Sequence, residues 1–275
     1  MGKGEIIESE NAEVVTNYRN YVMDTSVSYL YREHHIKQNI ENNLKFRQEI
    51  LPIGKVNLNI FEVIDLLGEI VDESDPDSRN PQIFHAIQTG EACRKLHPDK
   101  DWFHLTGFIH DLGKVCAHKL LYNLPQWAVV GDTFPIGCAF SDKIIYNEFF
   151  TQNSDSHHEL YGTKLGIYKE GFGFENMIFS WGHDEYLFQV LKANYCKLPE
   201  EALYIIRFHS FYPWHDKAAY DYFADEKDLK MLPFLKDFQL CDLYSKVDEK
   251  FDIEERKKYY EKLIEKYFDS PILKW

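Results

Sequence analysis

The chain has 275 residues, of which 44% are hydrophobic and 16% aromatic, so it can bury a sizeable core and is not an intrinsically disordered type. Its 45 acidic and 31 basic side chains give a formal net charge of −14, which disfavours nucleic acid and anionic membranes as partners. No apolar run is long enough to span a bilayer, and the acidic start MGKGEIIESE has no signal or transit character. Five cysteines without a CxxC pair fit a reducing compartment, so we expect a cytoplasmic protein, and we expect a monomer.

The chain predicts one helical domain. Residues 1–16 are expected to form a mobile tail, and residues 17–275 show no repeat, linker or shift in composition that would mark a boundary. A first helix is predicted from a cap at Asp24 or Thr25 to about residue 49, because apolar residues recur at four-residue intervals. The segment LPIGK ends it.

Three further helices are predicted in the next part of the chain. Apolar residues between Ile60 and Val71 mark the second, and the carboxylate-rich loop DESDPDSRNP follows it. Pro81 suits the first turn of a third helix, PQIFHAIQTGEACRKLH, which carries His85. After the turn HPDKD, Asp101 can cap a helix that contains His110.

The second half of the chain begins with a segment that is harder to assign. Residues 115–172 have Pro and Gly breaks and are interpreted as a long ordered loop with a short hairpin, of the kind that often has a function. Helices are then predicted at about 174–180, 183–194, 199–210 and 226–247, and EERKKYYEKLIEKYF forms the last. The predicted fold class is therefore all-α.

Six polar residues stand on predicted helices, or at their ends, among apolar neighbours. They are His85, His110, Asp111, His183, His209 and Asp242. Such groups are costly to bury unless they are paired or bind a metal, and imidazole and carboxylate suit iron, manganese or zinc. Asp111 has two oxygens and could bridge two metal ions. Four imidazoles and two carboxylates would nearly fill two coordination spheres and leave open positions, which favours a catalytic site.

The alternative for any one of these residues is a hydrogen-bonded core side chain, and a His-Asp pair alone is weak evidence for a site. Six in a consistent helical order make that reading much less favourable. The remaining histidines are interpreted as lying mostly in turns or polar surroundings: His34, His35, His97, His104, His118, His157, His158 and His215.

The order His, His-Asp, Asp resembles the HD-domain superfamily, whose members are typically helical metal-dependent phosphohydrolases. Longer blocks are similar to the myo-inositol oxygenase family, from about residue 18 to the C-terminus. These blocks are DESDPD, FHAIQTGEACRKLHPDKDWFHLTGFIHDLGKV, PQWAVVGDTFPIGC, SWGHDEYLFQVLK, RFHSFYPWH and DLYSK.

The resemblance implies an HD-type helical bundle around a mixed-valent Fe(II)/Fe(III) pair that cleaves the ring of myo-inositol with O2 to give D-glucuronate. It implies that His85, His110 and Asp242 hold one iron, that His183 and His209 hold the other, and that Asp111 bridges them. It also implies a substrate shell made of Arg19, Asp72, Ser74, Asp75, Lys114, Gly131, Asp132, Ser210 and Lys246.

The chemistry of a neutral polyol suits that shell, because carboxylates accept from hydroxyl groups and lysines donate to them. Lys114 lies one helical turn beyond His110 and could stabilise a metal-bound alkoxide, so it is a predicted catalytic residue together with Asp111. Lys114 could instead be a charge at a helix C-terminus, Arg19 a surface ion pair, and the Asp and Gly residues turn formers.

Two other functions stay open at this point. An HD-type phosphohydrolase would use the same metals on a phosphate ester, with Arg19, Lys114 and Lys246 as its basic pocket, although the acidic DESDPD loop disfavours it. A catalytically silent scaffold is disfavoured because all six candidate ligands are present.

Overall fold

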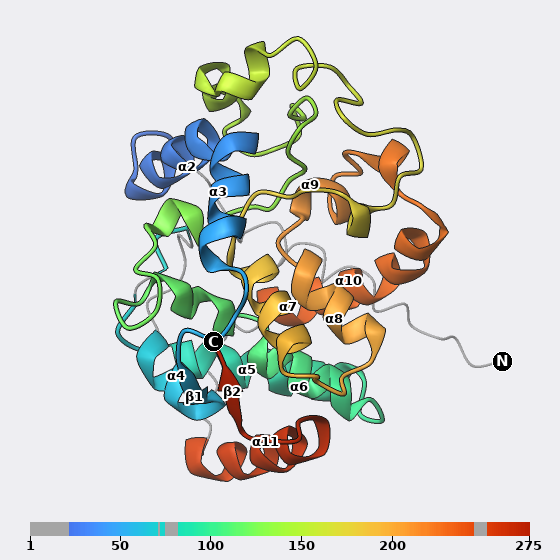
Figure 1. Ribbon diagram of the computed structural model, residues 1–275. Coiled ribbons are helices and arrows are strands. Elements are labelled where there is room, and N and C mark those ends of the chain that lie inside the picture. The colour runs from blue at the N-terminus through green and yellow to red at the C-terminus, as the bar shows by residue number, and fades with distance from the viewer. Residues whose placement is uncertain (1–21, 71, 75–81, 245–251) are drawn as a thin grey trace, which may run out of the picture.

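The computed structural model describes residues 22–70, 72–74, 82–244 and 252–275, so the predicted tail at 1–16 lies outside the described residues. The described α-helices are α2 (Ser26–Lys37), α3 (Ile40–Ile50), α4 (Ile60–Leu67), α5 (Gln82–Leu96), α6 (Asp101–Ile109), α7 (His183–Ala193), α8 (Glu200–Phe208), α9 (Tyr212–His215), α10 (Glu226–Tyr244) and α11 (Ile253–Tyr267). In Figure 1, α2 and α3 lie at the upper left, α7 and α8 lie near the middle, and α11 lies at the lower end. The predicted all-α class is confirmed.

The first predicted helix is in fact two helices. Thr25 caps α2 as expected: its side chain accepts from the backbone N–H of Ser28, whose side chain accepts from the N–H of Thr25. The helix ends at Lys37, and Asn39 takes an extended conformation and caps α3 by accepting from Asn42 at 2.9 Å. The prediction of one helix to residue 49 was wrong because an Asn cap interrupts an otherwise continuous apolar face.

A small antiparallel sheet was not predicted. β1 (Asn57–Asn59) pairs with β2 (Ile272–Lys274), with Leu58 opposite Leu273. Trp275 follows β2 and is fully buried; its backbone N–H donates to Val56 at 2.8 Å and its indole N–H donates to Leu58 at 3.1 Å. Strands of three residues are too short to show an alternating pattern.

The long segment 115–172 contains only 3-10 turns and irregular backbone. The turns, including those just beyond this segment, are η1 (Leu112–Ala117), η2 (Gln126–Ala128), η3 (Asn147–Gln152), η4 (Ser154–His157), η5 (Phe174–Asn176) and η6 (Asp221–Phe223). The predicted hairpin is absent from this fully described segment, where the single bridge joins Pro135 to Phe179. The helix predicted at 174–180 is also wrong, since only the turn η5 forms there.

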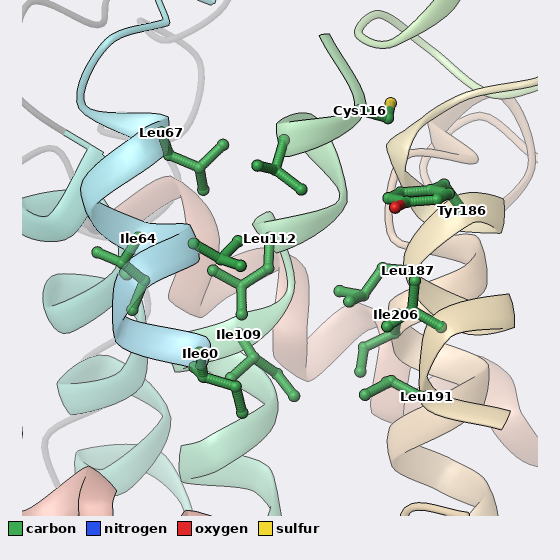
Figure 2. Packing of buried hydrophobic residues seen from close by; sticks show 14 of the residues in the cluster. Ile60, Ile64, Leu67, Ile109, Leu112, Cys116, Tyr186, Leu187, Leu191 and Ile206 are labelled. Atoms are coloured by element: carbon green, nitrogen blue, oxygen red, sulfur yellow. The ribbon is translucent and has the colours of Figure 1, made fainter. Parts of the chain in front are cut away.

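The main core lies around the segment that leads from α6 into η1. Figure 2 shows Ile64 of α4 and Leu187 of α7 pointing toward Leu112 from opposite sides. All three side chains are at most 2% exposed. Packing from both sides fixes the position of the residues just before Leu112, which are His110 and Asp111. Among the described residues, no helix combines the length and apolar character needed to cross a membrane.

The reading of the remaining histidines as residues of turns or polar surroundings is largely wrong. His34, His35, His104, His118 and His215 are at most 5% exposed. Each donates to or accepts from a fixed partner; for example, His35 Nε2 donates to the carbonyl of Ile145 at 2.7 Å. Each of these buried rings thus has at least one fixed partner, so the residues are core histidines.

Candidate metal centre

All six predicted metal ligands converge at one place in the core. They come from five helices or helix ends: α5 carries His85, His110 caps the C-terminus of α6, His183 begins α7, His209 caps the C-terminus of α8, and α10 carries Asp242. Two groups of candidate ligand atoms result, one made by His85, His110 and Asp111 and the other by Asp111, His183 and His209.

The first group surrounds Asp111 Oδ2 and Asp242 Oδ1. His85 Nε2 lies 3.3 Å from Asp111 Oδ2 and 3.2 Å from Asp242 Oδ1. His110 Nε2 lies 3.5 Å from each of the same two oxygens. Two imidazoles and two carboxylates therefore face one small volume.

The second group surrounds the other oxygen of the same aspartate. Asp111 Oδ1 lies 3.3 Å from His183 Nε2 and 3.8 Å from His209 Nε2. Because its two oxygens face different histidine pairs, Asp111 has the position that a carboxylate bridging two metal ions requires. The side chain is 10% exposed, so the shared group is enclosed by protein.

A glycine allows the two halves of this arrangement to meet. A Cβ at Gly113 would lie 2.0 Å from the carbonyl oxygen of His183, which no side chain could accommodate. Gly113 stands in η1 between Asp111 and Lys114. The absence of a side chain lets η1 pack directly on the first residue of α7, which brings Asp111 to His183.

The orientation of three histidine rings suits a metal. Nδ1 of His110, His183 and His209 lies 2.8, 2.8 and 3.0 Å from the carbonyls of Gly107, Val129 and Ile206. A carbonyl only accepts, so Nδ1 carries the proton and Nε2 presents a lone pair.

If both rings were neutral in this tautomer, two lone pairs would face each other, since His183 Nε2 lies 3.2 Å from His209 Nε2. A cation between them removes that repulsion. In the first group, His85 Nε2 lies 3.3 Å from His110 Nε2. The donor set therefore fits two metal ions, each held by nitrogen and oxygen.

The charges of the metal-free cluster lead to the same conclusion. Burial opposes protonation of His85, yet its bonds to Asp111 and Asp242 prevail and raise its pKa to about 9. Burial also opposes protonation of His183, but Asp184 and Asp111 raise its pKa to about 10. The carboxylates thus hold positive charge on neighbouring rings, a role that a metal ion can take over.

Asp111 and Asp242 stay ionised in spite of their burial. Burial raises the pKa of Asp111, but His110 and Lys114 outweigh it and hold that pKa well below its usual value. Burial also raises the pKa of Asp242, but its bonds to His110 and His85 outweigh burial and hold that pKa well below its usual value.

Lys114 lies beside the centre, as predicted. Its Nζ is 2.7 Å from Asp111 Oδ2 and 2.7 Å from Asp72 Oδ2. Burial disfavours its charge, but the two carboxylates raise its pKa above the ordinary value. Ser74 donates through its N–H at 2.8 Å and its hydroxyl at 2.7 Å to Asp72 Oδ1. Lys114 therefore ties the loop after α4 to the shared aspartate.

Asp184 is a member of the centre that the sequence analysis missed. It is 2% exposed, and its Oδ1 lies 2.8 Å from His183 Nε2 and 3.7 Å from His209 Nε2. Burial raises its pKa, but His183 and His209 outweigh burial and lower that pKa to about 2. The one signal in the sequence is weak: Asp184 follows His183 directly, as Asp111 follows His110, but an aspartate in the first turn of a helix is common.

Asp184 also links the histidines to predicted substrate residues. Ser210 donates its hydroxyl to Oδ1 at 3.1 Å, and Thr133 donates its hydroxyl to Oδ2 at 3.1 Å. Asp132, beside Thr133, is 1% exposed and accepts from the hydroxyl of Tyr31 at 3.1 Å. Gly131 has φ +108°, which suits glycine.

The structure thus places Asp72, Ser74, Lys114, Gly131, Asp132 and Ser210 in or next to the network around the cluster. Three other predicted substrate residues, Arg19, Asp75 and Lys246, lie outside the described residues.

The fold is helical, and it brings four histidines and the shared aspartate Asp111 into two adjoining ligand groups. These features define a protein of the HD type with a candidate dinuclear metal site. Comparison with known proteins gives the particular family. The family model described as Myo-inositol oxygenase matches residues 24–275. The chain belongs to this family, and the prediction from sequence is confirmed.

Curated relatives match over 80% or more of their own length. The inositol oxygenase of Dictyostelium discoideum is 47% identical over 267 residues, which cover 96% of this chain and 91% of the relative. Inositol oxygenase 1 of Arabidopsis thaliana is 48% identical, with 90% of this chain and 80% of the relative covered. The inositol oxygenase of Danio rerio is 46% identical, with 94% and 92% covered.

Proposed function

We propose that this chain is an oxygenase that cleaves the ring of myo-inositol with O2 to give D-glucuronate, and that its cofactor is a mixed-valent Fe(II)/Fe(III) pair. The observation that carries the proposal is the position of Asp111, whose two oxygens face two separate histidine pairs. Membership of the myo-inositol oxygenase family supplies the reaction.

The proposed ligands follow the two groups. His85, His110 and Asp242 would hold one iron, His183 and His209 would hold the other, and Asp111 would contribute one oxygen to each group. The irons, when bound, supply redox chemistry toward O2 and acidify a coordinated hydroxyl.

The residues around the irons bind and orient the polyol. Lys114 directs its ammonium at the edge of Asp111, so it can stabilise negative charge that develops on a substrate oxygen. Asp72 presents an acceptor fixed by Ser74, and Asp132 and Ser210 lie on the side of His183 and His209. A hydroxyl-rich ring requires many such partners, and a missing one costs affinity. Arg19, Asp75 and Lys246 are proposed as further substrate residues.

A phosphohydrolase is disfavoured as the function of this site. The described lysine at the centre, Lys114, is already within 2.7 Å of two carboxylates. Asp184 and Asp242 add two more acidic groups around the same histidines. Two bound metal ions would offset these carboxylates, so the phosphohydrolase is disfavoured because Lys114 is already paired and because the family match is to Myo-inositol oxygenase.

We further propose that the protein acts as a cytoplasmic monomer. All five cysteines are free thiols, and four of them are buried, which suits a reducing compartment.

The test is a stoichiometric assay of the iron-loaded protein. Given myo-inositol and O2, we expect glucuronate to form in amounts equal to the O2 consumed, with no phosphate released from phosphate esters. Partly reduced protein should show the EPR signal of a coupled Fe(II)/Fe(III) pair. Release of phosphate without O2 uptake would overturn the proposal.

A matched pair of histidine variants tests the ligands. His209→Ala should lower both the iron content and the turnover, because an imidazole is lost from the second group. His104→Gln is the control, since His104 is 1% exposed but bonds to Tyr259 and to the carbonyl of His97, away from the centre. Full activity of His209→Ala at half the iron content would contradict the assignment.

A further inference from the structure

A small cavity opens next to Lys114 and Asp72. Its volume is about 10 Å³, enough for one water-sized group such as a hydroxyl, and its described lining residues are Leu67, Ile70, Asp72, Lys114, Gln126, Val129 and Val130. Four of these residues are aliphatic, so polar groups are few in this wall. Asp72 and Lys114 belong to the proposed substrate shell, whereas Gln126 has not been assigned a role.

Gln126 carries a polar atom that the fold leaves without a partner. Its side-chain oxygen is buried and makes no hydrogen bond with the described part of the chain. A buried polar group in this state costs folding free energy, and proteins keep such groups where they have a use.

The backbone around Gln126 holds the side chain in place. Pro125 precedes it with φ −65°, and η2 begins at Gln126. Its carbonyl accepts from the N–H of Val129 at 2.9 Å and of Val130 at 3.0 Å. The next carbonyl, that of Trp127, is 2.7 Å from Nδ1 of His34. Because the turn is fixed in this way, the amide cannot easily move to find a partner elsewhere.

We propose that the amide of Gln126 faces this cavity and binds a hydroxyl group of the substrate, which makes Gln126 a specificity-determining residue. This inference rests on the proposed function. A ring hydroxyl both donates and accepts, so it satisfies the amide in either orientation. Asp72 and Lys114 line the same cavity, so a hydroxyl that enters beside them can also bond to the amide of Gln126.

The test combines stability with binding. Gln126→Met keeps the length of the side chain and removes the amide. The metal-loaded variant without inositol should unfold at the same temperature as the wild type or higher, because an unsatisfied group has been removed. Its dissociation constant for myo-inositol, measured anaerobically by calorimetry, should rise roughly tenfold or more. Gln126→Leu is the second variant if the first does not fold.

Monodeoxy-inositols give the sharper readout. If Gln126 binds one particular hydroxyl, the analogue that lacks it should bind the wild type and Gln126→Met equally well, while the other analogues still discriminate. A matched control is Thr89→Val in α5. The hydroxyl of Thr89 is likewise buried without a described partner, but Thr89 does not line the cavity. Thr89→Val should leave inositol binding unchanged.

Two outcomes would overturn the role inferred for Gln126, and a third would overturn the proposed function on which that role rests. Unchanged inositol affinity in Gln126→Met, or an equal loss of affinity for every analogue, contradicts a specific contact. A wild-type protein that neither binds nor oxidises inositol contradicts the proposed function itself. The stability comparison keeps its meaning in that case, so the two failures can be told apart.

Discussion

The replacement Asp184→Asn tests whether the residue that the sequence analysis missed supports the metal centre. Asp184 lies 2.8 Å from His183 Nε2 and accepts from Ser210 and Thr133. Asparagine has nearly the same shape and keeps one accepting oxygen. Its NH2 group cannot accept, and the negative charge is lost.

The magnitude follows from the bonds that change. Hydrogen bonds to a charged group contribute about 1.5–3 kcal/mol each. Here one of two accepting oxygens is replaced in a side chain that is 2% exposed, so little solvent screening reduces the effect. Loss of one such bond corresponds to a roughly 10- to 150-fold change in an equilibrium constant. We expect the metal held by His183 and His209 to bind about 10- to 100-fold more weakly, in the range typical of partners of metal ligands.

The assay is competition with a chelator of known affinity, combined with metal analysis. At limiting iron, the content of Asp184→Asn should fall toward one ion per chain, because the ion held by His85, His110 and Asp242 keeps its ligands. Asp228→Asn is the control. Asp228 is 1% exposed and accepts from Tyr204 at 2.7 Å, away from the centre. If Asp184→Asn binds both ions as tightly as the wild type, Asp184 has no role in the centre.

Three further predictions concern proton release, close packing and the end of the chain. The pKa values of His85 and His183 are raised to about 9 and 10, so both rings are protonated at pH 7 before metal binds. Metal binding should therefore release protons, and the affinity for metal should increase from pH 6 to 9. Calorimetry in buffers of different ionisation enthalpy measures the proton release, and no release at pH 7 would contradict the prediction. Gly113→Ala should lower both stability and metal content, because its Cβ would lie 2.0 Å from the carbonyl of His183; circular dichroism and metal analysis check it, and normal loading would refute the close contact. Trp275→Ala should lower the free energy of unfolding by about 3–5 kcal/mol in urea titrations, since a fully buried indole is lost. The iron bound per folded chain should not change. A loss below about 1 kcal/mol would contradict the close packing of the indole.

The identity of the candidate ligands could be predicted because their chemistry conflicts with their surroundings. His85, His110 and His209 interrupt apolar helical faces, and each conflict is visible within a few residues of sequence. Asp184 presents no such conflict. An aspartate in the first turn of a helix is favoured by the helix dipole, so its presence after His183 has an ordinary explanation.

The core histidines were misread for a related reason. Whether a buried ring is satisfied depends on its partner, and here the partners are distant in sequence. His34 bonds to the carbonyls of Trp127 and Asp132, and His35 bonds to that of Ile145. The local pattern of apolar and polar residues shows where a histidine stands, but it does not show which distant carbonyl the ring will bond to. The pattern therefore cannot distinguish a turn histidine from a core histidine.

The same limit applies to the geometry of the centre itself. The sequence HDLGK contains a ligand, a shared ligand, a glycine and a lysine, and a helical reading separates His110 and Asp111 by about 100° around the axis. In the structure the α-helix ends at Ile109 and a 3-10 turn follows at Leu112. This change of backbone, together with the contact that Gly113 permits, turns Asp111 so that its two oxygens reach different histidine pairs. Two ions can share one carboxylate here because the helix stops where it does, and a variant that extended the helix through Gly113 would separate the two halves of the site.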